Sequence, residues 1–298
     1  MKYYAITLDP LHIGAGGYRL GRVDNTIIRD AGSDLPKIPG SSLAGIARSY
    51  AAMQAEAADQ DAVKNCQNNF KGNCGDCIIC KAFGYASDEK NKNSHIGLLH
   101  FSDAHIVAFP VRTLMGPVWV TSPTALVRVG ITLDKANTPK EDSLCVNFDL
   151  LTSTADNRTR LNLGWLYLPA VKMKSCAELD PLRGQLGRIT ATPRIAIAPD
   201  WLFAEVVNSN LEVRTSVSID PATGAAKTGA LFTYEAIPAA ALLAFDVDAD
   251  AWRCEQQNHF LPEELEDMVE KAFRICAVLG MGGMSTRGFG RMDIKKEA

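Results

Sequence analysis

The 298-residue sequence lacks an apolar run long enough to cross a bilayer, which argues against a membrane-spanning helix. Residues 1–6 lead directly into an alternating strand pattern rather than a signal peptide, so we expect a cytoplasmic protein. The sequence also lacks a basic excess, because 31 Lys and Arg stand against 34 Asp and Glu, a net charge of −3. This balance argues against binding of nucleic acid through a generally basic surface, so any such contact must be local.

No internal repeat or low-complexity tract interrupts the chain, and 47% of its residues are hydrophobic, which is ample for a core. We therefore expect one large domain over residues 1–298. Charge is unevenly distributed, since residues 1–50 hold six Lys and Arg against four Asp and Glu, a net +2 that leaves −5 for the remainder. A local basic contact, if there is one, is expected near the start of the chain.

Residues 11–48 combine features that suit a ligand carrying phosphate. The glycines at positions 14, 16, 17 and 21 can take positive φ and let a ligand approach peptide N–H groups. An extended segment, Val23 to Ile28, carries Asp24, which lies between Arg22 and Arg29. The glycines do not match G-x-G-x-x-G, because Arg19 stands where the third glycine belongs, so a nucleotide-cofactor site is the weaker interpretation.

The same stretch ends where a helix begins. Ile38-Pro39-Gly40-Ser41-Ser42 breaks the extended chain, and a serine is expected to cap a helix that starts at about Ser42. Free N–H groups at a helix N-terminus favour anions such as phosphate.

The rest of the pattern predicts a mixed α+β fold. Strand-like runs at 213–219 and 230–237 flank turn residues at 220–224, which indicates a β-hairpin, and residues 161–168 are predicted to form one strand. Apolar residues at helical spacing, acids at the start and Gly280 at the end predict a helix over about 263–279, followed by a strand at 290–294. This order is typical of a ferredoxin-like or RRM-type core with insertions.

Four of the eight cysteines lie within fifteen residues, which favours metal binding over disulfides in a cytosolic chain. They are Cys66, Cys74, Cys77 and Cys80. Four thiolates complete a tetrahedral zinc site, and a polar loop with little core of its own is what such a site would fold. Two C-x-x-C steps share Cys77, so His95 could replace one ligand, and free thiols are the alternative.

Three motifs span nearly the whole chain in the order that one family shows. The first comprises LHIGAG, GRVDNTIIRD and LPKIPGSSLAG, the second is TGAAKTGALFTYEAIP at 223–238, and the third is LGMGGMSTRGFGRM at 279–292. Together they resemble the signature of the RAMP superfamily, the Cas7-type backbone subunits of type III CRISPR effector complexes. Within this superfamily, RTLMGPVWVTSPTAL at 112–126 is most similar to the type III-B subunit, with the type III-A subunit next.

The resemblance implies a ferredoxin-like core with a cysteine-rich insertion at about 60–97 and another at about 131–235 that includes a thumb-like hairpin. It also implies a subunit that binds guide crRNA along its length, beside copies of itself in a filament and other effector subunits. In such subunits the acid at the matching V-D position cleaves complementary target RNA at regular intervals, and here that acid is Asp24.

Asp24 also suits this chemistry as a residue type. Internal RNA cleavage requires a 2′-hydroxyl to be deprotonated and aligned with the phosphorus, and a carboxylate can act as the base or hold a divalent ion that does so. Mg²⁺ is the implied ion, because one carboxylate plus phosphate oxygens suits a cation that keeps several waters. The alternative is a non-catalytic crRNA-binding scaffold in which Asp24 is structural.

Cations, glycines and polar residues of these motifs are the candidates for RNA contacts. They are His12, Gly14, Gly16, Arg19, Arg22, Lys37, Gly40, Ser41, Ser42, Arg48, Lys227, Gly282, Gly283 and Arg287. Ala44 stands in GSSLAG where many relatives carry lysine, which shifts a phosphate contact towards Arg48 and the two serines. Any one of the arginines could instead be a solvated surface charge.

Overall fold

The structure, a computed structural model, describes residues 1–16, 23–58, 77–86, 94–140, 142–150, 159–257 and 260–297. Its helices are α1 (Gly40–Ala58), α3 (Ile78–Phe83), α4 (Pro123–Arg128), α5 (Asp180–Leu186), α6 (Asp200–Ser209), α7 (Ala251–Gln257) and α8 (Pro262–Leu279). Its strands are β1 (Lys2–Thr7), β2 (Lys37–Ile38), β3 (Gly84–Tyr85), β4 (His95–Ile96), β5 (Leu99–Phe101), β6 (Ala104–Thr113), β7 (Gly116–Thr121), β8 (Leu144–Val146), β9 (Arg160–Leu163), β10 (Leu166–Lys172), β11 (Ile195–Ile197), β12 (Glu212–Ile219), β13 (Ala226–Ala236), β14 (Leu242–Ala249) and β15 (Met292–Lys296).

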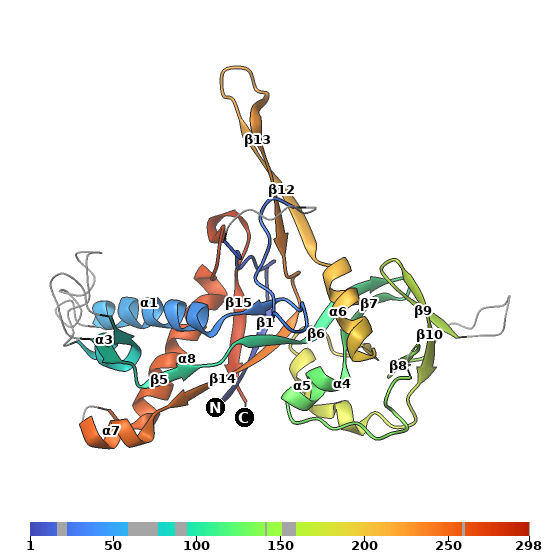
Figure 1. Cartoon of the computed structure of the whole chain (residues 1–298), viewed down its shortest axis with the longest axis horizontal. Helices are drawn as coiled ribbons and strands as arrows, with labels where there is room; N and C mark the ends of the chain where they lie inside the picture. Colours follow the sequence, from blue (N-terminus) through green and yellow to red (C-terminus); the bar gives the residue numbers. More distant parts are fainter. Residues whose placement is uncertain are drawn as a thin grey trace.

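One large sheet runs through the molecule in the strand order β15-β1-β14-β6-β7-β11-β8-β10-β9 (Figure 1). Its first four strands are antiparallel neighbours. Because α1 falls between β1 and β6 in the chain and α8 falls between β14 and β15, this part has the β-α-β-β-α-β order of a ferredoxin-like unit. Parallel pairing of β7 with β11 and of β8 with β10 makes the whole sheet mixed. The predicted α+β class is confirmed.

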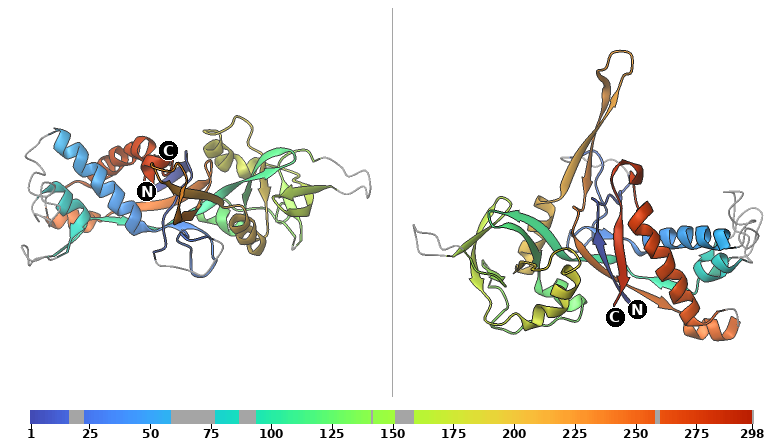
Figure 2. Two further views of the ribbon diagram at one scale, coloured as in Figure 1. Left: turned by 90° about the horizontal axis from the view of Figure 1, so that it is seen from above. Right: turned by 180° about the vertical axis from the view of Figure 1, so that it is seen from behind.

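One part of the core lies where helices α1 and α8, side by side in Figure 2, pack on each other and α8 covers β14 and β15. Tyr3 on β1 stacks on Phe245 with ring centroids 5.5 Å apart and meets Phe273 of α8 edge-on, also at 5.5 Å. Both arrangements are favourable aromatic geometries in addition to the apolar area that they bury. The predicted last helix is confirmed, since α8 begins at Pro262 and ends before Gly280, whose φ is +75°.

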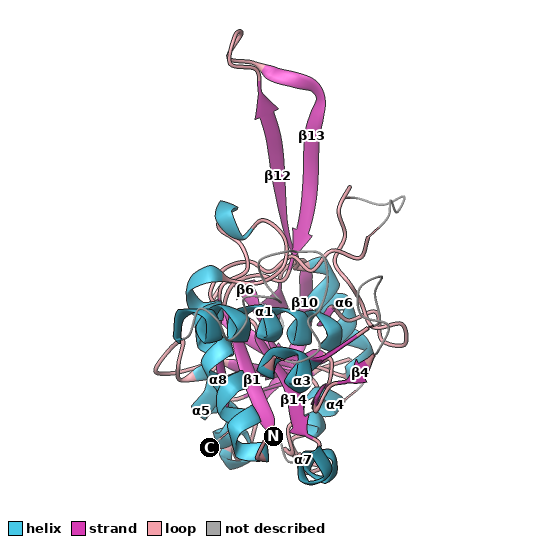
Figure 3. Ribbon diagram, turned by 90° about the vertical axis from the view of Figure 1, so that its left-hand side faces the viewer, coloured by secondary structure: helices cyan, strands magenta, loops and turns pink. Residues whose placement is uncertain are grey.

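Strands β12 and β13 form a hairpin that projects from the rest of the molecule, as Figures 1 and 3 show. Thr215 faces Thr233, and Val217 faces Leu231, in its antiparallel register. The predicted hairpin is confirmed, although β13 begins at Ala226, four residues earlier than expected. Apolar side chains on it are exposed, with Leu231 63% accessible, so the described part of the chain leaves them uncovered.

Two local predictions were wrong. Residues 161–168 form two strands rather than one, because β9 ends at Leu163 and an antiparallel β10 starts at Leu166. Gly164 between them has φ +58°, a left-handed conformation that glycine adopts at little cost. Helix α1 starts at Gly40 rather than near Ser42, so Ser41 and Ser42 lie inside its first turn.

The cysteine-rich region is described only in part. Cys66 and Cys74 lie outside the described residues. Cys77 caps α3, where its Sγ accepts a hydrogen bond from the N–H of Cys80 at 3.4 Å, and Cys80 is buried. His95 lies on β4, opposite Tyr85 of β3, with the two rings stacked at 6.0 Å. Within the described part of the chain no three His, Cys, Asp or Glu side chains form a group that could hold a metal, so zinc stays a prediction.

A search of the described residues finds no helix with both the length and the apolar character that crossing a bilayer requires.

Candidate functional site

Asp24 lies beside the base of the hairpin, on an extended segment that adds to the free edge of β13. The N–H of Asn25 donates to the carbonyl of Thr233 at 3.0 Å, and the N–H of Glu235 donates to the carbonyl of Asn25 at 3.0 Å. The Asp24 side chain is exposed to solvent rather than buried in the core. The predicted acid is therefore accessible to a ligand that approaches the foot of the hairpin.

Among the described residues, Thr233 alone holds the Asp24 carboxylate. Its Oδ2 accepts hydrogen bonds from the N–H and from the hydroxyl of Thr233, both at 2.8 Å. These bonds, the amide first, stabilise the charged form and lower the pKa of Asp24 below its ordinary value. Asp24 is consequently an anion at neutral pH, which makes it a good cation ligand and a weak base.

Arg29 does not flank the acid as its place in the sequence suggests. Its Nη2 lies 2.7 Å from Oε1 of Glu235, and Oε2 of the same carboxylate accepts the N–H of Ile27 at 3.3 Å. Both side chains of the ion pair are largely buried, at 15% and 11% exposed. The ion pair therefore joins the extended segment that carries Asp24 to β13, two residues beyond Thr233. The Arg29 guanidinium is neutralised by Glu235 and is not available to RNA.

The glycine-rich motif at 279–292, the closing motif, lies against the first loop, which is the segment from Leu11 to Gly16. The N–H of Gly283 donates to the carbonyl of His12 at 3.0 Å. A Cβ on Gly282, whose φ is +79°, would lie 2.5 Å from that same oxygen, so this close approach requires glycine. Gly14, Gly16 and Arg287 are exposed around this contact. Two predicted RNA-binding motifs from opposite ends of the chain are thus brought together.

His12 is buried beneath this surface, and this opposes the predicted RNA contact. Its side chain is only 7% exposed, and its Nδ1 lies 2.7 Å from the carbonyl oxygen of Glu235. Its ring meets that of Tyr234 edge-on at 5.6 Å. In this structure His12 packs the first loop onto β13.

Three of the predicted phosphate contacts, Lys37, Gly40 and Ser42, already have partners within the chain at the N-terminus of α1. Asp103 accepts the N–H of Gly40 at 2.8 Å and forms an ion pair with Lys37 at 2.7 Å. The N–H of Ser42 donates to Pro39 at 2.9 Å. A carboxylate thus stands where a helix N-terminus favours an anion, and Ser41 is the exposed residue of this turn.

Arg48 is likewise committed within the chain. One end of its guanidinium donates to the carbonyl of Gly84, and its Nη2 lies 3.4 Å from Sγ of Cys80. The side chain is therefore directed at α3 and β3 rather than at the surface around Asp24. The predicted guide contact by Arg48 is not supported by this arrangement.

The remaining candidates lie at the hairpin or outside the described residues. Lys227 is exposed on β13 near the hairpin tip. Arg19 and Arg22 fall outside the described residues.

Sequence patterns missed Arg214, whose guanidinium lies 4.8 Å from the centroid of the Phe289 ring and joins the hairpin to the closing motif. They also missed Thr233. No local signal marks either residue, because both contact segments distant in the chain.

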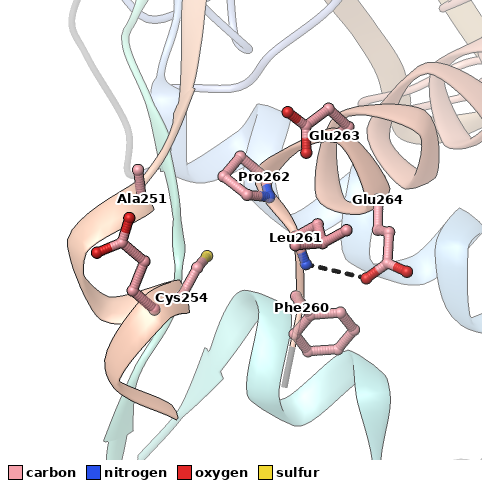
Figure 4. A pocket seen from close by; sticks show the side chains of 8 residues that line it. Ala251, Cys254, Phe260, Leu261, Pro262, Glu263 and Glu264 are labelled. Atoms are coloured by element: carbon pink, nitrogen blue, oxygen red, sulfur yellow. Dashed lines mark hydrogen bonds between the residues drawn. The ribbon is translucent and has the colours of Figure 1, made fainter. Parts of the chain in front are cut away.

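A pocket of about 660 Å³ lies elsewhere, between α7 and the start of α8 (Figure 4). Glu255, Glu263 and Glu264 line it, and Glu264 accepts the N–H of Leu261 at 3.0 Å. None of the predicted site residues that the structure describes lines it, and its carboxylates would repel the phosphates of RNA. The surface around Asp24 is therefore the candidate site.

Replacing Asp103 with asparagine tests how much its contacts at the start of α1 contribute to stability. The bonds from Lys37 and Gly40 lower the pKa of Asp103, so its stabilisation is present above its ordinary pKa of 3.8 and is lost as pH falls through the lower, folded value. We expect D103N to lower the free energy of unfolding by about 1–2 kcal/mol at neutral pH, a charged hydrogen bond discounted for exposure. In denaturant unfolding, the difference in the free energy of unfolding between wild type and D103N should be smaller at about pH 3 than at neutral pH. An equal difference at both pH values would contradict this prediction.

Comparisons with known proteins agree with the motifs. The RAMP superfamily model matches residues 4–293. The CRISPR system Cmr endoribonuclease Cmr4 of Pyrococcus furiosus is 31% identical over 255 residues, which cover 80% of this chain and 78% of that protein. The CRISPR system Cms endoribonuclease Csm3 of Methanothermobacter thermautotrophicus is 36% identical over 85 residues, 28% of this chain and 31% of that protein.

A solved structure adds agreement at the level of the fold. A chain of the type III-B Cmr-beta complex bound to cognate target RNA superposes with a TM-score of 0.63 at 18% identity, covering 99% of this chain and 95% of that one. The longer match to a Cmr protein and the shorter match to Csm3 follow the order of resemblance that the sequence predicted. The chain belongs to the RAMP superfamily.

Proposed function

We propose that this chain is a backbone subunit of a type III CRISPR effector complex, which binds guide crRNA and cleaves complementary target RNA with Asp24. The observation that carries the proposal is an exposed, ionised carboxylate placed where the hairpin base and the extended segment meet. A relative with 31% identity is named an endoribonuclease, and a chain of similar fold belongs to a complex bound to target RNA.

The low pKa of Asp24 limits the roles that it can play. A carboxylate held by two donors to one oxygen is a weak proton acceptor, but it can orient a 2′-hydroxyl or ligate a cation. Oδ2 is committed to Thr233, and Oδ1 accepts no hydrogen bond from the described residues, so Oδ1 is the atom directed to the reaction. Together with phosphate oxygens it suits Mg²⁺, which would neutralise charge at the reacting phosphate.

The groups around Asp24 suit the RNA backbone. Exposed glycines of the first loop and of the closing motif allow close approach of phosphates, and Arg287 supplies a cation. The overall charge of −3 requires such local contacts, and copies of the chain aligned in a filament would add them along one guide.

The projecting hairpin is proposed to act as a thumb. Its exposed apolar residues, Leu231 and Phe232 among them, suit insertion between stacked bases of a guide–target duplex. Packing on a neighbouring copy of the chain would bury the same residues.

Zinc is proposed as a structural ion for Cys66, Cys74, Cys77 and Cys80. The two described cysteines fit it, since the Cys80 N–H donates to Sγ of Cys77 and the Arg48 guanidinium donates to Sγ of Cys80. Both contacts favour the thiolate form that ligates zinc.

The size pattern of cleaved RNA tests the proposed function. End-labelled RNA complementary to the guide, incubated with the assembled complex and Mg²⁺, is expected to give evenly spaced products, because cutting sites repeat with the subunits. A chelator should abolish them, and RNA without complementarity should remain intact.

A non-catalytic scaffold is the second candidate, favoured by the hydrogen bonds that give Asp24 a structural partner. It predicts RNA that stays protected with or without the metal.

A further inference from the structure

Thr233 and Asp24 are joined by a reciprocal contact. The Thr233 hydroxyl lies 2.8 Å from Oδ2 of Asp24 and 2.9 Å from the backbone nitrogen of Asp24. The carboxylate can only accept and the backbone N–H can only donate. The one hydroxyl therefore donates its proton to the carboxylate and receives the N–H on its lone pair, which a side chain without a hydroxyl cannot do.

The backbone of Thr233 completes the contact. Its N–H donates to the same Oδ2 at 2.8 Å, and its carbonyl accepts the N–H of Asn25 at 3.0 Å. Two residues further along β13, Glu235 is fixed to Arg29 by the buried ion pair. The Asp24 side chain is thus fixed to β13, the strand that continues into the projecting hairpin.

We infer that Thr233 is a positioning residue for RNA cleavage, which turns Oδ2 of Asp24 towards the hairpin and leaves Oδ1 directed at the RNA. This inference rests on the proposed function. If Thr233 holds the carboxylate, the position of Asp24 depends on the position of the hairpin base. RNA that displaces the hairpin would then also move the carboxylate.

Valine in place of threonine is the test, because it keeps the β-branched shape and removes only the hydroxyl. In complexes assembled with crRNA, T233V is expected to cleave about 10- to 100-fold more slowly, the usual loss when a residue that supports a ligating side chain is removed. Target binding should be unchanged.

The pH profile separates positioning from a general structural effect. Loss of the hydroxyl donor raises the pKa of Asp24 towards its ordinary value, so the acidic limb of the rate profile should move to higher pH. T233S retains the hydroxyl and should restore both the rate and the profile.

Thr215→Val is the matched control. Thr215 lies directly across the hairpin from Thr233, is exposed, and makes no side-chain hydrogen bond among the described residues. T215V should therefore cleave as the wild type does. T233A also lacks the hydroxyl and should cleave as slowly as T233V. It takes the place of T233V if complexes that carry the valine variant do not assemble.

Two outcomes distinguish this inference from the proposed function. If D24N is inactive while T233V matches the wild type in rate and pH profile, the inference is overturned and the proposed function stands. If D24N cleaves normally, the proposed function fails, and carboxyl-carbon NMR of the full chain still decides whether T233V raises the pKa of Asp24. No rise in that pKa would overturn the reciprocal contact itself.

Discussion

Asparagine at position 24 is expected to slow target cleavage by about 100- to 10,000-fold, the range over which a positioned acid or base contributes to catalysis. Asparagine has nearly the shape of aspartate, and its amide oxygen can still accept the N–H of Thr233. It lacks the negative charge that would ligate Mg²⁺ or orient the 2′-hydroxyl. Single-turnover cleavage of labelled target by complexes that carry D24N measures this effect.

Binding must be measured beside cleavage, because a misfolded subunit would lose both. Guide occupancy and target affinity of the D24N complex should equal those of the wild type, since Asp24 carries no favourable charge for phosphate. The wild-type rate should not decline between about pH 8 and pH 5 through protonation of Asp24, because its pKa is already below the ordinary value. Undiminished cleavage by D24N would remove Asp24 from the mechanism and favour the scaffold.

Alanine at position 40 is expected to have the largest effect on stability. A Cβ at Gly40 would overlap the backbone carbonyl of Phe101, and backbone cannot move aside as a flexible side chain can. Overpacking of this kind costs about 1–3 kcal/mol, and more where nothing yields. The same shift would strain the bond between the Gly40 N–H and Asp103. Chemical denaturation of G40A should show a lower free energy of unfolding.

Gly45 is the control on the same helix. Among the described residues, no atom lies within 4 Å of a Cβ built there, and the position is exposed. G45A should therefore raise the free energy of unfolding by up to about 1 kcal/mol, the difference in helix propensity between glycine and alanine. Equal effects of G40A and G45A would show that the contact with Phe101 is unimportant.

Local patterns predicted much of the architecture. Apolar spacing, leading acids and Gly280 sufficed for α8, because helix signals lie within one helix length of each other. Turn residues between two strand-like runs sufficed for the hairpin. The single strand expected at 161–168 was wrong, because the chain reverses at Gly164, and a lone glycine does not distinguish a reversal from a bulge in a continuous strand.

The residues of the candidate site were predicted less completely than the architecture. Asp24 was identified from its motif, and the structure exposes it beside the hairpin. Arg48 and Lys37 were chosen as cations near that motif, yet one contacts α3 and β3 and the other is paired with Asp103. Charge in a sequence reveals that a cation exists but not whether an anion elsewhere in the fold neutralises it.

The sequence alone determined the class of fold and the family and singled out Asp24 as the candidate acid, because periodicity, turn residues and motifs are properties of neighbouring residues. Only the tertiary structure decided which groups meet: Thr233 lies 209 positions from Asp24, and Glu235 lies 206 positions from Arg29. Such contacts form when the sheet brings distant segments together, and a hydroxyl or a carboxylate carries no local mark of the partner that it will find. The direction of the Asp24 carboxylate is therefore a property of the folded chain.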